Sequence, residues 1–449
     1  MADKNSPLIL GTEPIGKLLA RYSIPAIIAM TASSLYNMVD SIFIGHGVGP
    51  MAIAGLALTF PLMNLAAAFG SLVGVGASTL VSVKLGQKDY VGANHVLGNV
   101  LVLNIIMGIL FSVVFLLFLD PVLYFFGASE QTLPYARDYM EVILYGNVVT
   151  HIYLGLNNLL RSSGHPKMAM YATLASVVIN CALNPLFIFS WGWGIKGSAW
   201  ATVISQVISL VWLLWHFSKK SELLHFRKGI YGLHRDLVSA MLSIGLSPFL
   251  MNLCSCLIVL LINLGLKEHG GDVAIGAYGI VNRITFLFIM IIMGFNQGMQ
   301  PIAGYNFGAR QFPRVLEVTR MTTWWAVGVA TFGFLLCHLA PRAVICLFTT
   351  DEELVSVAVK GLHIVFLVFP IVGFQMVASN FFLSVGLSRQ AIFLSLTRQL
   401  IFLIPSLIIL PRFFGQVGVW GSIPLADFTA AIVTAIMLMR QFRKFKTAS

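Results

Sequence analysis

Long apolar runs follow one another along this chain, separated by glycine, proline or charged residues. Each run reaches the roughly 20 residues that a helix needs to cross a bilayer. Lipid offers the backbone no hydrogen-bond partner, so each run is predicted to be an α-helix. Twelve membrane spans are expected, over 18–44, 53–82, 94–119, 136–159, 168–190, 197–217, 237–265, 275–304, 316–339, 356–384, 390–410 and 418–439.

The composition agrees with this pattern. Of the 449 residues, 58% are hydrophobic and 10% are charged, against about 25% charged residues in an average soluble protein. A soluble fold cannot bury that much apolar surface, and a disordered chain has the opposite composition. We therefore expect a multi-pass membrane protein that is surrounded by the lipid bilayer.

Basic residues set the expected orientation. If the twelve spans alternate in direction, 21 of the 28 lysines and arginines fall on the side of the N-terminus, 6 fall on the other side, and Arg283 lies inside a helix. Positively charged loops stay in the cytoplasm. Both termini are thus expected on the cytoplasmic side of the inner membrane. The net charge of +11 reflects this topology, and no nucleic-acid partner is expected.

The two halves of the chain match each other at a nearly constant offset of 222 residues. KLGQKDY at 84–90 corresponds to NFGARQF at 306–312, and SEQTL at 129–133 corresponds to DEELV at 351–355. A shared register along the whole chain indicates an internal duplication. The expected organisation is an N-lobe over 1–217, a basic cytoplasmic linker over 218–236 and a C-lobe over 237–449.

The duplication predicts the architecture. Six spans per repeat is an even number, so both repeats enter the membrane from the same side. Such repeats are related by a pseudo-twofold axis along the membrane normal and are typical of transporters built around a central cavity. The expected fold class is an all-α polytopic protein with two six-helix bundles. A helical scaffold without transport activity is the alternative.

Polar side chains occur at one depth in three spans of the first half. Tyr36 and Asp40 are one turn apart in the first span, and Asn180 and Asn184 have the same spacing in the fifth. Thr202 lies in the sixth span, about as far from its outer end as Asp40 and Asn184 are from theirs. We predict a hydrogen-bonded group around a single carboxyl group.

Asp40 is the expected coupling residue. An acid inside the membrane is costly and is functional by default, and no cationic partner is evident for Asp40. Burial disfavours the charged form of such a carboxyl group, so it could take a proton from outside and release it inside. The alternative is a protonated acid that only bonds a neighbouring backbone group.

Pro25 lies inside the first span, where it removes a backbone hydrogen bond and permits a kink. A kink in the helix that carries Asp40 would connect protonation with bending. Pro248 is the repeat equivalent of Pro25, so a bend that is only structural and shared by both repeats is the alternative.

The second intramembrane acid, Asp427, is expected to have a structural role. Arg283 lies at a similar depth in the eighth span. We predict that these two residues form an ion pair, in which the acid keeps its charge.

A substrate cavity is the next expectation. Asn157 or Asn158 in the fourth span, and Gln206 in the sixth, extend the polar faces. The flexible thioethers of Met290 and Met293 suit an adaptable drug site. Residues of this type also commonly face lipid, which is the alternative for the methionines.

Motifs for phosphate, dinucleotide or metal binding fail on inspection. GTEPIGKL at 11–18 lacks the Ser or Thr of a phosphate-binding loop, and GWGIKG at 192–197 lies between two helices without a βαβ unit. The five cysteines have no metal-ligand spacing, and neither HExxH nor GxSxG occurs. We expect no enzyme activity, no metal and no cofactor, with energy supplied by a gradient of H⁺ or Na⁺.

Several segments resemble the MATE (multidrug and toxic compound extrusion) family. They are SLYNMVDSIFIGHGVGPMAIAGLALTFP, LNNLLRSSGHPKMAM, NPLFIFSWGWGIKGSAWATVISQ and QGMQPIAGYNFGARQF. The resemblance covers essentially the whole chain. It implies two six-helix lobes in an outward-facing V, and export of organic cations or drugs against proton or sodium entry.

Within this family the chain is similar to the DinF-like branch. The resemblance places Asp40 in a polar cluster of the N-lobe with Tyr36, Asn180, Asn184 and Thr202. The branch often has a second acid in the fifth span, where this chain has Asn184. The C-lobe acids of the NorM branch, in the seventh and tenth spans, are absent from this sequence.

Together these observations predict a secondary active multidrug efflux antiporter that works by alternating access as a monomer. Its substrates would be organic, cationic drugs, and its cellular effect antibiotic resistance. A flippase for a lipid-linked oligosaccharide or another amphiphile is the alternative, although only Arg283 lies clearly within a span to form the cationic cavity that such a substrate needs. A receptor or channel without transport is a further alternative.

Overall fold

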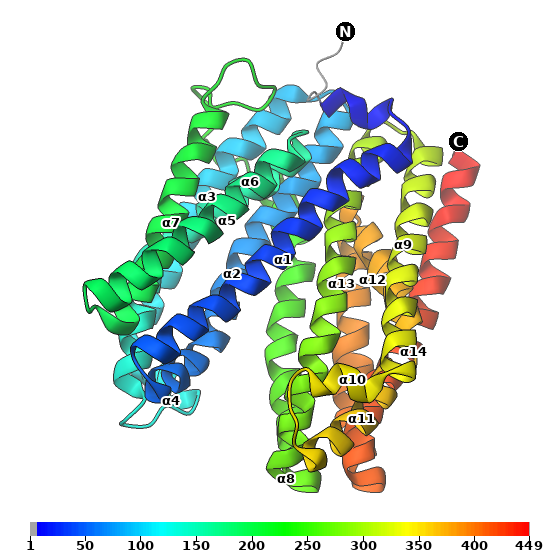
Figure 1. The fold of residues 1–449 in the computed structure, drawn as a ribbon. Coiled ribbons are helices and arrows are strands. Elements are labelled where there is room, and N and C mark those ends of the chain that lie inside the picture. Colours follow the sequence, from blue (N-terminus) through cyan, green and yellow to red (C-terminus); the bar gives the residue numbers. More distant parts are fainter. Residues whose placement is uncertain (1–6, 449) are drawn as a thin grey trace. The chain divides into compact units, whose positions relative to one another are not determined.

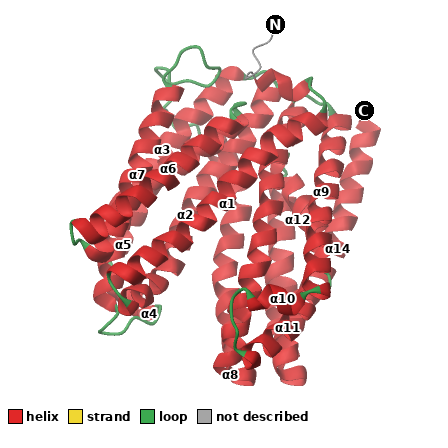
Figure 2. Ribbon diagram, viewed as in Figure 1, coloured by secondary structure: helices red, strands yellow, loops and turns green. Residues whose placement is uncertain are grey.

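The structure, a computed structural model, describes residues 7–448, and every regular element in that range is a helix (Figures 1 and 2). The first half contains η1 (Pro7–Gly11), α1 (Ile15–Gly47), α2 (Pro50–Gly86), α3 (Tyr90–Leu117), α4 (Leu119–Phe125), α5 (Leu133–Ser162), α6 (Pro166–Pro185), the π-helical η2 (Leu186–Ser190) and α7 (Gly194–Phe217). The second half contains α8 (Arg235–Gly308), α9 (Phe312–Leu339), α10 (Pro341–Cys346), α11 (Glu352–Phe366), α12 (Phe369–Ser384), α13 (Ser388–Leu396), the π-helical η3 (Thr397–Leu403) and α14 (Ile404–Ala448).

Two glycines divide the longest helices. Gly271 in α8 has φ +65° and Gly415 in α14 has φ +54°. Glycine adopts this left-handed conformation without the penalty that a Cβ brings, so α8 and α14 each consist of two helices joined by a sharp turn. Both turns fall between spans that the hydrophobic pattern predicts as separate.

The predicted membrane spans are present. Nine helices of the described chain are long and apolar enough to cross a membrane, and a tenth span is formed by α11 and α12, which meet at a bend of 50°. Two further features are consistent with a total of twelve spans. One is α5, whose buried Asn147, His151 and Asn157 lower its hydropathy, and the other results from the break at Gly415. The all-helical polytopic fold is therefore confirmed.

The described chain forms two compact units that each combine separate segments. Unit 1 contains Ile28–Phe249 together with the residues up to Thr12, and unit 2 contains Glu13–Ile27 together with the chain from Leu250 onward. Helix α1 therefore begins in unit 2 and continues in unit 1, with the change two residues after Pro25. Helix α8 begins in unit 1 and continues in unit 2, with the change one residue after Pro248.

Glycines permit the packing of these exchanged half-helices. In unit 2, a Cβ added to Gly298 of α8 would lie 2.1 Å from the hydroxyl oxygen of Ser23. In unit 1, a Cβ added to Gly76 of α2 would lie 1.9 Å from the carbonyl oxygen of Met241. Small residues allow helices in a membrane to approach closely. Because Gly76 and Gly298 are repeat equivalents, the duplication extends to this packing.

The linker between α7 and α8 is attached to α3 by two asparagines. Asn94 donates from Nδ2 to the carbonyl oxygen of Leu223 at 3.0 Å and accepts from the backbone N–H of His225 at 2.9 Å. Asn99 accepts from the backbone N–H of His234 at 3.1 Å. The linker therefore has a defined path at one end of unit 1, whereas α4 lies at the opposite end (Figure 1).

Candidate functional site

Asp40 lies at the centre of a buried polar group in unit 1. Its side chain is 5% exposed. Its Oδ1 accepts a hydrogen bond from Asn184 Nδ2 at 3.0 Å and another from Ser198 Oγ at 2.5 Å. Three helices, α1, α6 and α7, thus contribute to the surroundings of one carboxyl group.

The hydrogen bonds continue from Asp40 to the other predicted residues. Asn184 Nδ2 also contacts Asn180 Oδ1 at 2.6 Å. Asn180 Nδ2 then donates to Thr202 Oγ1 at 3.1 Å, and the hydroxyl oxygens of Thr202 and Tyr36 are 2.7 Å apart. The structure therefore brings together all five residues that the polar pattern selects.

One further member, Ser198, was not selected from the sequence. It is fully buried and precedes Thr202 by one turn of α7. Each of the three helices thus supplies two polar residues at i and i+4, a spacing that places both on one helix face. This repeated spacing was the signal available for Ser198, which lies in the first turns of α7, where a serine also suits a helix end.

Asp40 has only neutral partners in the part of the chain that the structure describes. It forms no ion pair there with lysine, arginine or histidine, and its hydrogen-bond donors, Asn184 and Ser198, carry no charge. In the same group, Asn184 Oδ1 is buried without a hydrogen-bond partner among the described residues. An unpaired buried charge is costly, and a buried acceptor without a partner is also unfavourable. The group therefore combines a buried acid that has no cationic partner with a buried acceptor that has no donor, both among the described residues.

The second acid, Asp427, has a different setting and requires a correction. Asp427 is 3% exposed, and its Oδ1 lies 2.5 Å from Arg398 Nε within unit 2. Arg283, the partner predicted from depth in the membrane, is exposed and forms no ion pair among the described residues. The acid is paired as predicted, but with a different arginine.

Helix geometry explains why the predicted pair does not form. Arg283 has a depth similar to that of Asp427 but lies on an exposed face of α8. Arg398 lies in η3, a π-helical segment, and such segments change the direction of the following side chains relative to an α-helix. Residue numbers predict how deep a side chain lies in the membrane. They do not predict on which face of the helix it lies when the helix contains a π-helical segment.

Two of the predicted cavity residues bind neighbouring parts of their own unit. Asn157 donates from Nδ2 to the carbonyl oxygen of Ala169 at 3.0 Å, which connects α5 to α6. Asn158 Oδ1 accepts from Arg161 Nη2 at 2.5 Å. Both amides therefore contribute to packing between and along helices, whatever their relation to a substrate.

The remaining cavity residues are divided between the two units. Gln206 Oε1 accepts a hydrogen bond from Thr150 Oγ1 at 2.5 Å, which connects α7 to α5 in unit 1. Met290 and Met293 are half-buried in the second part of α8, in unit 2. The structure does not bring these five residues into one group, and their role as a cavity lining stays a prediction.

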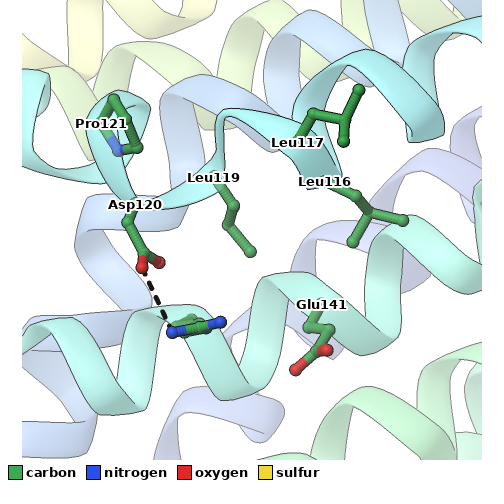
Figure 3. A pocket seen from close by; sticks show the side chains of 7 residues that line it. Leu116, Leu117, Leu119, Asp120, Pro121 and Glu141 are labelled. Carbon is green, nitrogen blue, oxygen red and sulfur yellow. Dashed lines mark hydrogen bonds and ion pairs between the residues drawn. The ribbon is translucent and has the colours of Figure 1, made fainter.

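A pocket of about 170 Å³ lies elsewhere in unit 1, between α5 and the end of α3 with α4 (Figure 3). An ion pair between Asp120 and Arg137, at 3.2 Å, crosses its edge. The pocket contains none of the predicted cavity residues. Its lining consists of Leu116, Leu117, Leu119, Asp120, Pro121, Arg137 and Glu141.

Proteins similar to this chain are known along its whole length. The chain is 28% identical over 430 residues to the multidrug export protein MepA of Staphylococcus haemolyticus, covering 94% of this chain and 93% of that protein. It is 28% identical over 429 residues to MepA of Staphylococcus aureus, covering 95% and 94%.

Solved structures give the same result. The MATE multidrug transporter DinF-BH is 36% identical, with a TM-score of 0.88 over 96% of both chains. A MOP superfamily transporter from Pyrococcus furiosus is 25% identical, with a TM-score of 0.92 over 98% of both chains. The family model MatE matches residues 25–186 and 244–408, one stretch in each half. This chain therefore belongs to the MATE family of transporters.

Proposed function

We propose that this protein is a secondary multidrug efflux antiporter that exports organic cations in exchange for protons, and that it is a transporter without enzyme activity. The proposal is supported by family membership and by the export function stated in the names of the MepA relatives. The observation that carries it is the setting of Asp40, a buried acid with neutral hydrogen-bond donors and no cationic partner among the residues that the structure describes.

The neutral partners of Asp40 suit a group that changes its charge. Asn184 Nδ2 and Ser198 Oγ stabilise the carboxylate as donors, without neutralising it. A hydroxyl group can also rotate and accept a hydrogen bond, so Ser198 can serve the protonated acid as well. Both protonation states are therefore accessible in one geometry, which is the requirement for a coupling residue.

The exchange follows from charge. When Asp40 binds a proton from outside, the carboxylate that attracts a cationic drug disappears, and the drug dissociates outward. When the proton leaves to the cytoplasm, the carboxylate returns and a new cation binds. Each pH unit of gradient supplies about 1.4 kcal/mol per proton. An exchange of one proton for one monovalent cation moves no net charge, so the membrane potential does no net work.

Pro25 provides a place where α1 can bend. A proline inside a helix removes one backbone hydrogen bond and lowers the resistance to bending. Pro25 lies two residues before α1 passes from unit 2 to unit 1, and Asp40 lies further along the same helix. Bending at Pro25 would thus alter the position of Asp40 relative to the first turns of α1 during the cycle.

The same observations support a proposal for the oligomeric state, the location and the substrates of the protein. The protein would act as a monomer in the cytoplasmic membrane, with both termini in the cytoplasm, and its substrates would be drugs that carry positive charge. Its activity would contribute to antibiotic resistance.

Transport by purified protein in liposomes tests the proposal. With an inward-directed proton gradient, the wild type is expected to transport a fluorescent organic cation, and dissipation of the pH difference should abolish this transport. Asp40→Asn should remove it, while Glu130→Gln, which changes an exposed loop acid, should not. Normal transport by Asp40→Asn would refute the role of Asp40. Transport driven by a sodium gradient alone would show that the coupling ion is Na⁺ and not H⁺.

A further inference from the structure

Three potential metal ligands converge at the linker end of unit 1. His165 directly precedes α6, His216 lies in the last turn of α7, and Glu222 lies in the linker. One possible ligand atom from each residue lies within 4.8 Å of those from the other two. His165 Nε2 and Glu222 Oε2 are 3.3 Å apart, and the two imidazole rings are 4.9 Å apart. The three residues come from three separate segments, so the fold itself creates the group.

His216 is the most informative of the three residues. Its side chain is buried, at 3% exposure. Its ring contacts the rings of His165 and Phe217, and one possible ligand atom of His216 lies within 4.8 Å of those of His165 and Glu222. A buried imidazole is more stable when its nitrogens have polar partners. A metal ion between His216 and its two neighbours would provide such a partner.

His165 already has the arrangement of a metal-binding histidine. Ser163 Oγ lies 3.5 Å from His165 Nδ1 and donates its own hydrogen to the carbonyl oxygen of Leu160 at 3.0 Å. Its lone pairs can therefore accept a hydrogen bond from the tautomer that carries a hydrogen on Nδ1. In this tautomer Nε2 can bind a metal ion that lies between it and Glu222, whose Oε2 is 3.3 Å away. Metal-bound histidines commonly donate their other N–H in this way.

Glu222 is held in place although it lies outside the helices. Its carbonyl oxygen lies 2.7 Å from His225 Nδ1, and the backbone N–H of His225 is bound by Asn94 of α3. The nearby Lys219 lies with its Nζ 3.7 Å from the centre of the Trp215 ring. The carboxylate therefore approaches the two histidines from a linker with a fixed path.

We propose that His165, His216 and Glu222 bind a divalent transition-metal ion, with Zn²⁺ as the preferred ion. Zinc accepts two imidazole nitrogens and one carboxylate oxygen at about 2.0–2.2 Å and leaves a fourth position for water. Imidazole ligands favour Zn²⁺ over Mg²⁺ or Ca²⁺, which prefer oxygen. The ion attaches the linker to the α5–α6 corner and to the end of α7. Sequence spacing cannot reveal this site, because His165 is distant from the other two ligands.

Zinc binding by the full-length protein tests this assignment. The protein is purified in detergent, freed of any histidine tag and of metal, and titrated with ZnCl₂ in a calorimeter. The wild type should bind one Zn²⁺ per chain, with no comparable binding of Mg²⁺. His216→Ala and Glu222→Gln should each raise the dissociation constant at least 10-fold. His269→Ala, which changes an exposed histidine outside the cluster, should leave it unchanged.

Protease sensitivity provides a second readout that depends on the linker and not on transport. Zn²⁺ should slow cleavage within the linker of the wild type, and Glu222→Gln, a change in a loop that leaves the helices intact, should abolish this protection. Absence of zinc binding, or equal affinity in wild type, His216→Ala and Glu222→Gln, would overturn the site. Asp40→Asn should bind Zn²⁺ normally, so the outcome is independent of the proposed antiport.

Discussion

The two buried intramembrane acids, Asp40 in unit 1 and Asp427 in unit 2, have similar burial and opposite surroundings. Asp40 accepts hydrogen bonds from Asn184 and Ser198, which carry no charge. Asp427 contacts the guanidinium group of Arg398. The duplication therefore did not preserve the electrostatics of the two halves.

This difference separates two uses of a carboxyl group. A buried acid paired with an arginine keeps its charge, because removal of either partner leaves the other charge uncompensated. A buried acid among amides and hydroxyls has no such constraint, and its charge can change with proton binding. We infer that unit 1 couples transport to an ion gradient, whereas the ion pair of unit 2 serves its structure.

Replacing Asp40 gives the largest expected effect. Asp40→Asn keeps the size of the side chain and an oxygen that accepts from Asn184 and Ser198, so the thermal stability of the protein should change little. Proton-driven transport should fall at least 10-fold, in line with the typical contribution of a positioned proton-transfer group, about 10²–10⁴-fold. Transport in proteoliposomes and a melting curve, measured on the same preparation, separate the two effects.

Breaking the Arg398–Asp427 pair should act on stability instead. Arg398→Ala leaves a buried carboxylate without its partner, which costs about 3 kcal/mol or somewhat less, because the arginine is 26% exposed. The double variant Arg398→Ala with Asp427→Asn should regain part of this loss. Denaturant unfolding in detergent measures the cycle. Strictly additive losses would show that the pair contributes no interaction energy and would remove the contrast with Asp40.

Ser198→Ala tests how much the hydrogen bond from Ser198 contributes to the function of Asp40. It removes one of the two hydrogen bonds to Asp40, an interaction worth about 1.5–3 kcal/mol when one partner is charged. We expect a loss of transport of roughly 10-fold and a shift of its pH dependence relative to the wild type. The control is Ser218→Ala, whose hydroxyl contacts only the carbonyl oxygen of Leu214 at the exposed end of α7. An unchanged pH profile for Ser198→Ala would argue against direct contact with the titrating group.

Asp89, an acid outside the membrane spans, offers a third setting. It caps α3 by accepting from the backbone N–H of Gly92, and its pair with Lys84 holds the pKa of Asp89 below its ordinary value. A lowered pKa in the folded state means that the stabilisation is present above the ordinary pKa and is lost as the pH falls. Asp89→Ala should cost about 1 kcal/mol as a lost helix cap, with a smaller difference from wild type near pH 3. Its partial exposure keeps the ionic part small.

Arg283→Ala should have the smallest effect. The side chain is exposed and has no ion pair among the described residues, and such substitutions usually change stability by less than about 0.5 kcal/mol. The unfolding free energy of Arg283→Ala and of its combination with Asp427→Asn provides the check. A measurable coupling energy between Arg283 and Asp427 would support the ion pair that the sequence predicts.

The sequence predicts most of the fold because the bilayer imposes simple rules. Span length and the lack of backbone partners in lipid determine twelve helices, and the breaks at Gly271 and Gly415 lie where apolar runs end. Helices such as α4 and α10, which connect spans, carry no comparable pattern. The passage of α1 from unit 2 to unit 1 and of α8 from unit 1 to unit 2 is also not visible in the sequence, because hydropathy does not say which surface a helix packs against.

Those members of the candidate site were predictable whose depth in the membrane and whose face of the helix both follow from residue numbers. Asp40, Asn184 and Thr202 lie in spans with clear outer ends, so their common level follows from residue numbers. Asp427 has an equally clear depth, but its partner Arg398 belongs to a π-helical segment, where counting residues per turn no longer gives the face. Ser198 shows a related limit, since a single serine near a helix end has several common explanations.

The passage of α1 and α8 between units affects how the molecule can be divided. If the chain were cut at the linker, each fragment would contain a helical segment that packs in the unit formed mainly by the other fragment. Neither product should therefore fold completely when synthesised alone, and both should be required together for an intact particle. We therefore expect that each half of this duplicated chain needs the other half in order to fold.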